Sequence, residues 1–413
     1  MRYYRIVITI IALAALAIPT LMAADNSDRI YGRIITVDGE EFEGLIRWDK
    51  NEGSWVDVLN GNKEIPKKFR RKAKRESRRK YKESIRLFGL RIGGSSFRWD
   101  GNVAQSGIRF GHIKSLEVID DDAALIVTQS GLEVELEGGS TDIGTGIREI
   151  VIEDRDEGEI ELDWDDIEKI EFMGARTNEE SIYGERLYGT LLTRRGEEYS
   201  GAVCWDVDEL FPVDILDGDG KRRSRKVKFG KIASIERYSS SAAKVVLKNG
   251  DEQILRGTND VDDSNRGIVI SDPGFGQVKV YWDEFDRLDF TGPVSVASYD
   301  DFDGGKELRG TVYTEDGEEF EGTIRWDNDE EYTWEILDGE YRDVEFDVEF
   351  GKIQQIEKRS RRSTVVTVWD GRSFRLSGSN DVDDDNKGIF IMSDDGDEEM
   401  VEWEDFAKVV FVK

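Results

Sequence analysis

The chain of 413 residues carries 89 acidic and 58 basic side chains, for a formal net charge of −31. A field of this sign repels DNA, RNA and anionic lipid, so the composition argues against a nucleic-acid-binding protein. One cysteine excludes an internal disulfide, and one histidine leaves little material for zinc binding or for nucleophile–base catalysis.

The first 24 residues have the order of a secretory signal peptide. Arg2 and Arg5 precede an apolar stretch over residues 6–17, and the small residues Ala23 and Ala24 follow. We expect cleavage after Ala23 or Ala24, with an uncleaved N-terminal anchor as the alternative. No second apolar segment of membrane-spanning length follows. The sequence therefore predicts an exported protein that is periplasmic, on the cell surface or secreted, without a transmembrane span after cleavage.

The rest of the chain contains two motifs, each written three times. The first reads YGRIITVDGEEFEGLIRWD from Tyr31, YGTLLTRRGEEYSGAVCWD from Tyr188 and RGTVYTEDGEEFEGTIRWD from Arg309. The second reads IVTQSGLEVELEGGSTDIGTGIREIVI from Ile126, VVLKNGDEQILRGTNDVDDSNRGIVI from Val245 and VTVWDGRSFRLSGSNDVDDDNKGIFI from Val366. Such internal similarity indicates a repeat architecture, with repeat pairs over residues 25–175, 183–291 and 306–413.

Both motifs end on an aromatic residue followed by apolar residues three and six positions later. These endings are Phe110, Ile113, Leu116; Phe229, Ile232, Ile235; Phe350, Ile353, Ile356; Trp164, Ile167, Ile170; Trp282, Phe285, Leu288; and Trp403, Phe406, Val409. The pattern predicts a strand end, one tight helical turn and a last short strand. The two motifs then become divergent copies of one unit of about 50 residues, with six units in three pairs.

Within a unit, apolar and polar residues alternate, as along 319–326, which predicts half-buried β-strands. Two-residue hairpin turns are predicted at Asp38-Gly39, Asn249-Gly250, Asp316-Gly317 and Asp370-Gly371. We therefore predict an all-β chain of tandem small β-barrel modules. The pattern resembles Sm-like small barrels in strand order and turn placement, and a propeller of six units is the alternative topology.

The first pair carries a basic insert over residues 62–106. Within it, one segment has eleven basic residues and a single acidic one: Lys67, Lys68, Arg70, Arg71, Lys72, Lys74, Arg75, Arg78, Arg79, Lys80 and Lys82. This segment is expected to bind a polyanion, an envelope protein, or an acidic face of its own chain or of a second copy. It is the feature that suggests a homo-oligomer.

Six of the ten tryptophans occupy equivalent repeat positions, and we expect them in the core: Trp48, Trp164, Trp205, Trp282, Trp326 and Trp403. The remaining four, Trp55, Trp99, Trp334 and Trp369, are left for a surface role such as stacking on a sugar.

Two acidic loops are the candidate metal sites. They contain Asn259, Asp260, Asp262, Asp263 and Asn265 in the second pair, and Asn380, Asp381, Asp383, Asp384, Asp385 and Asn386 in the third. Carboxylate and amide oxygens suit calcium, but the spacing is not that of an EF-hand. The alternative is a turn in which Asp and Asn cap their own backbone. In the first pair only Asp142 is kept, so an ion site there would be lost.

His112 and Cys204 align with basic residues that alternate outward. Both are therefore predicted at the surface, with Cys204 partly covered and open to an intermolecular disulfide. We predict a protein that is not an enzyme: an exported β-repeat scaffold or binding protein of the cell envelope, without a cofactor. A calcium-binding protein using the acidic loops is the alternative, and a carbohydrate-active enzyme is the second alternative.

Overall fold

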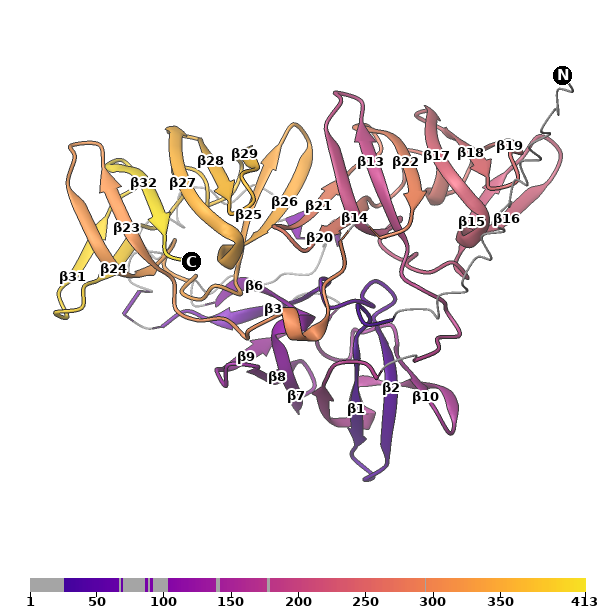
Figure 1. The fold of residues 1–413 in the computed structure, drawn as a ribbon, viewed down its shortest axis with the longest axis horizontal. Coiled ribbons are helices and arrows are strands. Elements are labelled where there is room, and N and C mark those ends of the chain that lie inside the picture. The colour runs from indigo at the N-terminus through magenta and orange to yellow at the C-terminus, as the bar shows by residue number, and fades with distance from the viewer. Residues whose placement is uncertain are drawn as a thin grey trace, which may run out of the picture.

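The computed structural model describes residues 26–66, 68–69, 86–87, 90–91, 103–138, 142–176, 179–293 and 295–413, and its regular structure is almost entirely β (Figure 1). The all-β prediction is confirmed. The predicted signal peptide, residues 1–24, lies outside the described residues. Within the described ranges, no helix has the length and apolar character needed to cross a membrane.

The first repeat pair forms one sheet and a hairpin. Its strands are β1 (Tyr31–Thr36), β2 (Glu41–Trp48), β3 (Val58–Glu64), β6 (Val103–Arg109), β7 (Ile113–Asp120), β8 (Ala123–Thr128), β9 (Glu133–Glu137), β10 (Ile150–Asp154), β11 (Gly158–Leu162) and β12 (Ile167–Phe172). The short strands β4 (Arg86–Leu87) and β5 (Leu90–Arg91) pair within the insert.

The second and third pairs repeat this pattern. The second contains β13 (Tyr188–Thr193), β14 (Glu198–Cys204), β15 (Ile215–Asp219), β16 (Ser224–Lys228), β17 (Ile232–Ser239), β18 (Ala242–Leu247), β19 (Glu252–Leu255), β20 (Ile268–Asp272), β21 (Gly276–Val280) and β22 (Phe285–Thr291). The third contains β23 (Arg309–Thr314), β24 (Glu319–Arg325), β25 (Ile336–Tyr341), β26 (Val344–Glu349), β27 (Ile353–Ser360), β28 (Ser363–Val368), β29 (Ser373–Leu376), β30 (Ile389–Met392), β31 (Glu398–Val401) and β32 (Phe406–Phe411).

The two motifs of a pair share one antiparallel sheet. Eight strands follow the same order in each pair: β9-β8-β7-β12-β1-β2-β10-β11 in the first, β19-β18-β17-β22-β13-β14-β20-β21 in the second and β29-β28-β27-β32-β23-β24-β30-β31 in the third. Strands β3 and β6 extend the first sheet beyond β9, and β26 and β25 extend the second beyond β21. The last strand of the second motif thus lies between two strands of the first. The sheets are not closed into barrels, so the six Sm-like modules are not confirmed. The propeller alternative is wrong, because it needs a separate sheet for each unit.

Short 3₁₀ helices occupy four of the six predicted aromatic endings, and turns occupy the other two, at Trp282 and Trp403. The helices are η1 (Phe110–His112), η2 (Trp164–Asp166), η3 (Phe229–Lys231) and η6 (Phe350–Lys352), each followed directly by a strand. Two further turns, η4 (Asn259–Val261) and η5 (Tyr299–Asp301), lie in connections. All four predicted hairpin turns differ from the prediction, because each loop has three residues, as between Thr36 and Glu40, and not two. Within each loop only the glycine has a positive φ, 81° at Gly39.

A glycine in the repeated motif lets neighbouring strands approach closely. A Cβ at Gly44 would lie 2.0 Å from the carbonyl oxygen of Glu153, and the equivalent distances at Gly201 and Gly322 are 2.2 and 2.1 Å. Any side chain there would push β2, β14 or β24 away from the next strand. Glycine occupies this place in all three copies because the backbone of the neighbouring strand lies where a Cβ would be.

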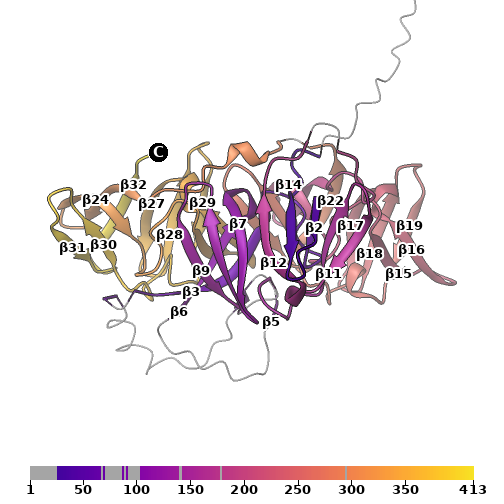
Figure 2. The same ribbon diagram turned by 90° about the horizontal axis from the view of Figure 1, so that it is seen from below.

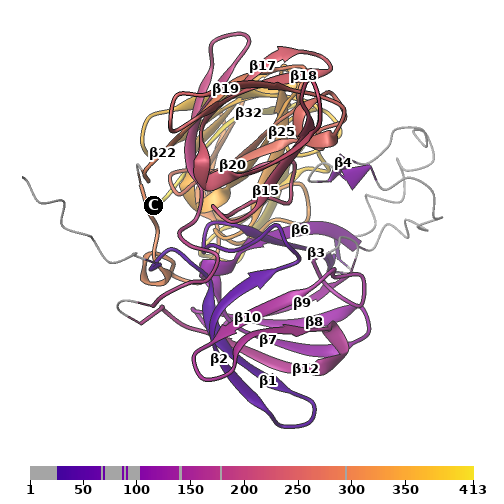
Figure 3. The same cartoon turned by 90° about the vertical axis from the view of Figure 1, so that its right-hand side faces the viewer.

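The core prediction for the six repeat tryptophans is confirmed, since each is at most 3% exposed. One apolar core belongs to the first pair, and the second and third pairs share another. They share it because the β25-β26 hairpin of the third pair adds to the edge of the second pair's sheet, where β26 pairs with β21. Figure 1 shows these two pairs side by side, and Figures 2 and 3 show the first pair lying against both of them.

The linker between the second and third pairs crosses the first pair. Its η5 turn contacts η1, where the Tyr299 hydroxyl donates to the Ile113 carbonyl at 3.0 Å. The Tyr299 ring lies 4.7 Å from that of Trp55. The linker therefore packs against the first repeat pair before the chain enters the third.

Candidate functional site

Each copy of the first motif ends in a turn with the sequence Trp-Asp-x-(Asn or Asp)-Glu, at residues 48–52, 205–209 and 326–330. In the first copy the Trp48 N–H donates to the Glu52 carbonyl at 2.9 Å, and the Glu52 N–H donates back at 3.0 Å. The two residues after the tryptophan have positive φ in every copy, 42° and 70° at Asp49 and Lys50. This tight turn holds an aspartate and a glutamate beside a buried tryptophan.

A third carboxylate comes from the second motif. The tryptophan Nε1 donates to the backbone carbonyl of Asp142, Asp260 or Asp381 at 2.9–3.0 Å. In the second pair, carboxylate oxygens of Asp206, Glu209 and Asp260 lie within 4.8 Å of one another. We call these sets the carboxylate clusters: the first is Asp49, Glu52 and Asp142, the second Asp206, Glu209 and Asp260, and the third Asp327, Glu330 and Asp381.

Protein donors hold the aspartates of the second cluster. The Arg266 backbone N–H donates to Asp206 Oδ1 at 2.6 Å, and its guanidinium Nη2 donates to Oδ2 at 2.8 Å. Asp260 Oδ2 accepts the backbone N–H of Asp217 at 2.5 Å, which ties β15 to the loop. The aspartates therefore join the two motifs and the hairpin into one unit.

The glutamate of each cluster has a buried oxygen without a partner. This oxygen is Oε2 of Glu52, Glu209 and Glu330, and Glu52 and Glu330 are only 4% and 6% exposed. Burial, followed by the charges of Asp260 and Asp206, raises the pKa of Glu209 to about 10. Burial also raises the pKa of Glu52 and Glu330 well above the ordinary value. At neutral pH each glutamate is either protonated or balanced by a cation.

In the second pair, the structure separates the loop residues that predicted a calcium site. Asp262 and Asn265 accept the backbone N–H two residues further along, at 3.0 and 2.9 Å, and Asp263 is exposed. The Asn259 side chain donates to the first aspartate of the second cluster. Of these loop residues, Asp260 alone places its carboxylate in the cluster.

The loop of the third pair is organised in the same way. Asp383 and Asn386 accept the backbone N–H two residues further along, at 2.8 and 2.9 Å, and Asp385 is exposed. Asn380 donates to the first aspartate of the third cluster, and Asp381 contributes the carboxylate.

The cluster residues outside the loops were missed, although the Trp-Asp-x-(Asn or Asp)-Glu sequence is visible in all three copies. In the first pair, the loop was predicted to keep only Asp142, so that an ion site there would be lost. Asp142 instead completes the first cluster: its Oδ2 accepts the Asn60 N–H at 2.9 Å, as Asp260 accepts that of Asp217.

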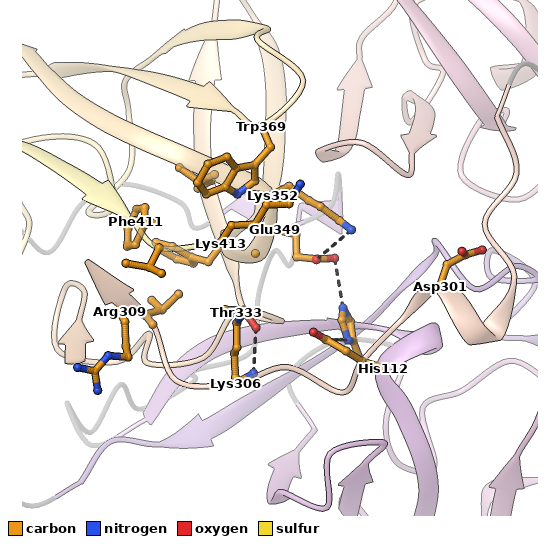
Figure 4. Close-up of a pocket in the computed structure, with 16 residues that line it drawn as sticks. His112, Asp301, Lys306, Arg309, Thr333, Glu349, Lys352, Trp369, Phe411 and Lys413 are labelled. Atoms are coloured by element: carbon orange, nitrogen blue, oxygen red, sulfur yellow. Dashed lines mark hydrogen bonds and ion pairs between the residues drawn. The ribbon is translucent and has the colours of Figure 1, made fainter. Parts of the chain in front are cut away.

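A cavity of about 190 Å³ lies between η1, the linker before β23 and the third pair (Figure 4). His112 forms part of its wall and is 3% exposed, so the prediction of a surface histidine is wrong. Its Nε2 lies 3.4 Å from Glu349 Oε2 and its Nδ1 3.7 Å from Asp303 Oδ1. The ring of Phe302 meets it edge-on at 5.0 Å. The linker and the third pair bury it, and both are distant in sequence.

Glu349 is the centre of this buried contact. Burial alone would raise its pKa, but the charges of Arg109 and then His112 lower it to about 2. Arg109 Nε lies 3.4 Å from Glu349 Oε2, and both side chains are at most 3% exposed. An ionised carboxylate thus fastens the first pair to the third.

Cys204 is 4% exposed and packs with Leu210 and Phe211. Burial raises the pKa of its thiol well above the ordinary value. The predicted surface position and intermolecular disulfide are therefore wrong. The local alternation suggested an outward side chain, but the segment after β14 folds over it.

The prediction that Trp55 and Trp334 are free for a surface role is also wrong, since they are 0% and 1% exposed. Both belong to the core around the first pair. Trp369 is half-buried and lines the cavity. Trp99 lies outside the described residues.

Of the basic segment, Lys68 alone is described. Its Nζ lies 3.4 Å from Glu398 Oε2, and the neighbouring Phe69 ring lies 4.8 Å from that of Phe390. The start of the insert therefore contacts the third pair. The other predicted contact residues lie outside the described residues: Lys67, Arg70, Arg71, Lys72, Lys74, Arg75, Arg78, Arg79, Lys80 and Lys82.

Comparison with known proteins adds no relative: no family model, curated protein or solved structure matches the chain. The fold and the carboxylate clusters define its class: an all-β repeat protein of three pairs, in each of which two motifs share one sheet.

Proposed function

We propose that the protein is an exported, non-catalytic β-repeat scaffold or binding protein of the cell envelope. The observation that carries this proposal is that buried ion pairs hold the first pair to both the second and the third. Arg186 Nη2 lies 3.1 Å from Asp57 Oδ1 between the first and second pairs, and both side chains are at most 6% exposed. Buried charges are costly unless they are matched, so such pairs specify one arrangement of the units. A scaffold needs that fixed arrangement.

The burial of the chemically reactive side chains supports a non-catalytic role. His112 and Cys204 are both buried in contacts between segments. The carboxylates of the clusters are largely buried as well, whereas a glycosidase presents its pair to a substrate cleft. These features favour the scaffold over the carbohydrate-active enzyme.

The finer part of the fold prediction belongs to this proposal: six units, arranged as three pairs, that resemble Sm-like small barrels in strand order and turn placement. The basic insert of the first pair is the contact for an envelope polyanion, an envelope protein or a second copy of the chain.

Fractionation of producing cells tests the export. We expect the protein in the envelope or medium, with an intact mass that corresponds to a start at Ala24 or Asp25. Recovery from the cytosol with residues 1–24 still attached would contradict the proposal. Deletion of 67–82 tests the insert, because an unchanged mass in solution and unchanged polyanion binding would remove it from the proposal.

A divalent-cation binder is the second candidate, and the second carboxylate cluster favours it. Three carboxylates lie within 4.8 Å, Arg266 balances one of them, and Glu209 Oε2 has no partner. Calcium would supply the missing charge. Millimolar calcium should then raise the melting temperature, because a ligand of the folded state stabilises it. The increase should be smaller in Glu209→Gln. No increase in the original protein would exclude this candidate.

A further inference from the structure

The cavity beside His112 brings free positive charge and an aromatic face together in an acidic protein. Trp369 is half-buried on its wall, and the Lys413 ammonium lies 5.6 Å from the ring centroid. Lys306 and Lys352 also line the cavity. Among the described residues, Lys306 and Lys413 form no ion pair. Positive groups without partners attract anions.

The acidic groups of the cavity are already bound by the protein. Asp301 accepts the backbone N–H and the hydroxyl of Ser298, each at 2.8 Å. Asp303 accepts the Gly305 N–H at 2.9 Å, and Glu349 is paired with three basic side chains. These hydrogen bonds orient Asp301 and Asp303, which keep their charge, and Lys306 and Lys413 are the basic groups of the cavity that remain for an anionic ligand.

Arg309 does not add to this charge. It lines the cavity, but its guanidinium points away from the other labelled groups (Figure 4) and lies 2.6 Å from Asp394. The volume of about 190 Å³ equals roughly six water molecules at ~30 Å³ each. That is enough for a carboxylate and part of one sugar ring.

Comparison of the three copies shows that only the third places an aromatic ring beside lysines at this position. Trp369 donates its backbone N–H to the Lys352 carbonyl at 3.0 Å, and Lys248 and Lys231 make the same contact in the second pair. The second copy thus has two lysines and no aromatic ring. In the first copy the equivalent residue, Gln129, donates to the linker carbonyl of Tyr299 at 3.1 Å, so the linker covers it.

We propose that this cavity binds a carboxylate-bearing sugar unit, such as a uronic acid of an acidic polysaccharide, with the ring on Trp369 and the carboxylate near Lys306 and Lys413. The indole offers an apolar face to the C–H groups of the sugar. The ammonium groups balance its charge and select against neutral sugars. The inference rests on the binding role proposed above and adds the ligand class and the site.

Isothermal titration calorimetry of residues 25–413 with trigalacturonate tests the proposal. Maltotriose, triglutamate and inorganic phosphate serve as comparison ligands. We expect saturable binding of trigalacturonate that weakens with salt, and at least tenfold weaker binding of the other three. No saturable binding, or equal binding of maltotriose, triglutamate or phosphate, would overturn the proposal.

Two variants locate the site. Trp369→Ala should weaken binding at least tenfold, which corresponds to about 1.4 kcal/mol, because it removes the apolar face for the sugar ring. Lys306→Gln with Lys413→Gln should do the same, and these exposed positions leave the fold intact. Lys231→Gln with Lys248→Gln, which removes the two lysines at the equivalent place in the second pair, is the matched control and should bind as the original protein does. Unchanged binding in the double variant would place the ligand elsewhere. Export and the scaffold proposal are tested separately by fractionation, so failure here leaves them standing.

Discussion

The second and third pairs are joined by backbone and apolar contacts, whereas the first pair is held to both by buried charges. Between the second and third, β21 and β26 pair from Gly276↔Val348 to Val280↔Val344, over a shared core. Around the first pair, Arg109 and Arg186 reach carboxylates of other segments. The same repeat thus forms two kinds of interface. The ionic interface is more sensitive to substitution, because removing one side chain of a buried ion pair leaves the other charge buried without a partner.

Phe275→Ala should have the largest effect, because this side chain lies between the sheets of the second and third pairs. It is 1% exposed, and its ring lies 5.1 Å from that of Phe374. We expect a loss of about 3–5 kcal/mol in the free energy of unfolding, measured by urea denaturation. Tyr238→Ala, at a position 60% exposed, is the control and should change it by less than about 0.5 kcal/mol. A loss below 1 kcal/mol at Phe275 would contradict the shared core.

Arg109→Met should cost about 3 kcal/mol in the same measurement, because it leaves Glu349 buried without its main partner. Adding Glu349→Gln should recover part of the loss. Arg342→Met is the control, since its pair with Glu197 is exposed, 50% and 29%, and should contribute less than about 1 kcal/mol. Equal effects of Arg109 and Arg342 would remove the distinction between the interfaces.

Glu209→Gln should stabilise the protein by about 2 kcal/mol at pH 7 in calcium-free buffer. The folded pKa of Glu209, about 10, is above its ordinary value of 4.5, so its contribution to stability is fully present below pH 4.5 and is lost as the pH rises. The gain from glutamine should therefore vanish near pH 4. Urea denaturation at pH 4, 5.5 and 7 measures this trend, with the exposed Glu198→Gln as control. A gain that does not depend on pH would argue against a buried, protonated Glu209.

Lys68→Met should have the smallest effect, below about 1 kcal/mol, because Lys68 and Glu398 are 56% and 44% exposed. The effect should disappear in 1 M salt, where charges are screened beyond about 3 Å. A large effect that persists in salt would show that this contact belongs with the buried ion pairs.

The predictable part of the molecule follows from repetition. Trp205 and Trp326 could be assigned to the core because three copies place tryptophan at the same position, and one hydrophobic position repeated in phase has one structural role. His112 could not be assigned, because its cover comes from Phe302 and Glu349, far along the chain. The surface position predicted for Cys204 was wrong for the same reason. Alternation shows which face of a strand a side chain is on, but not which other segment packs against that face.

The candidate sites divide in the same way. Asp260 was predicted because an Asn-Asp loop has a recognisable composition. Glu209 was missed although its Trp-Asp-x-(Asn or Asp)-Glu sequence is repeated, because only the folded turn brings it beside Asp260.

The sequence by itself determined the β-strands, the hairpins, the repeat and its buried tryptophans, because these depend on local alternation and on turn residues. Only the tertiary structure decided that two motifs share one sheet, that charges fasten the first pair, and that Trp369 meets free lysines at a cavity. Those results depend on which segments, distant in sequence, come into contact. These contacts decide which side chains are buried and which charges must be paired to offset the cost of burying them.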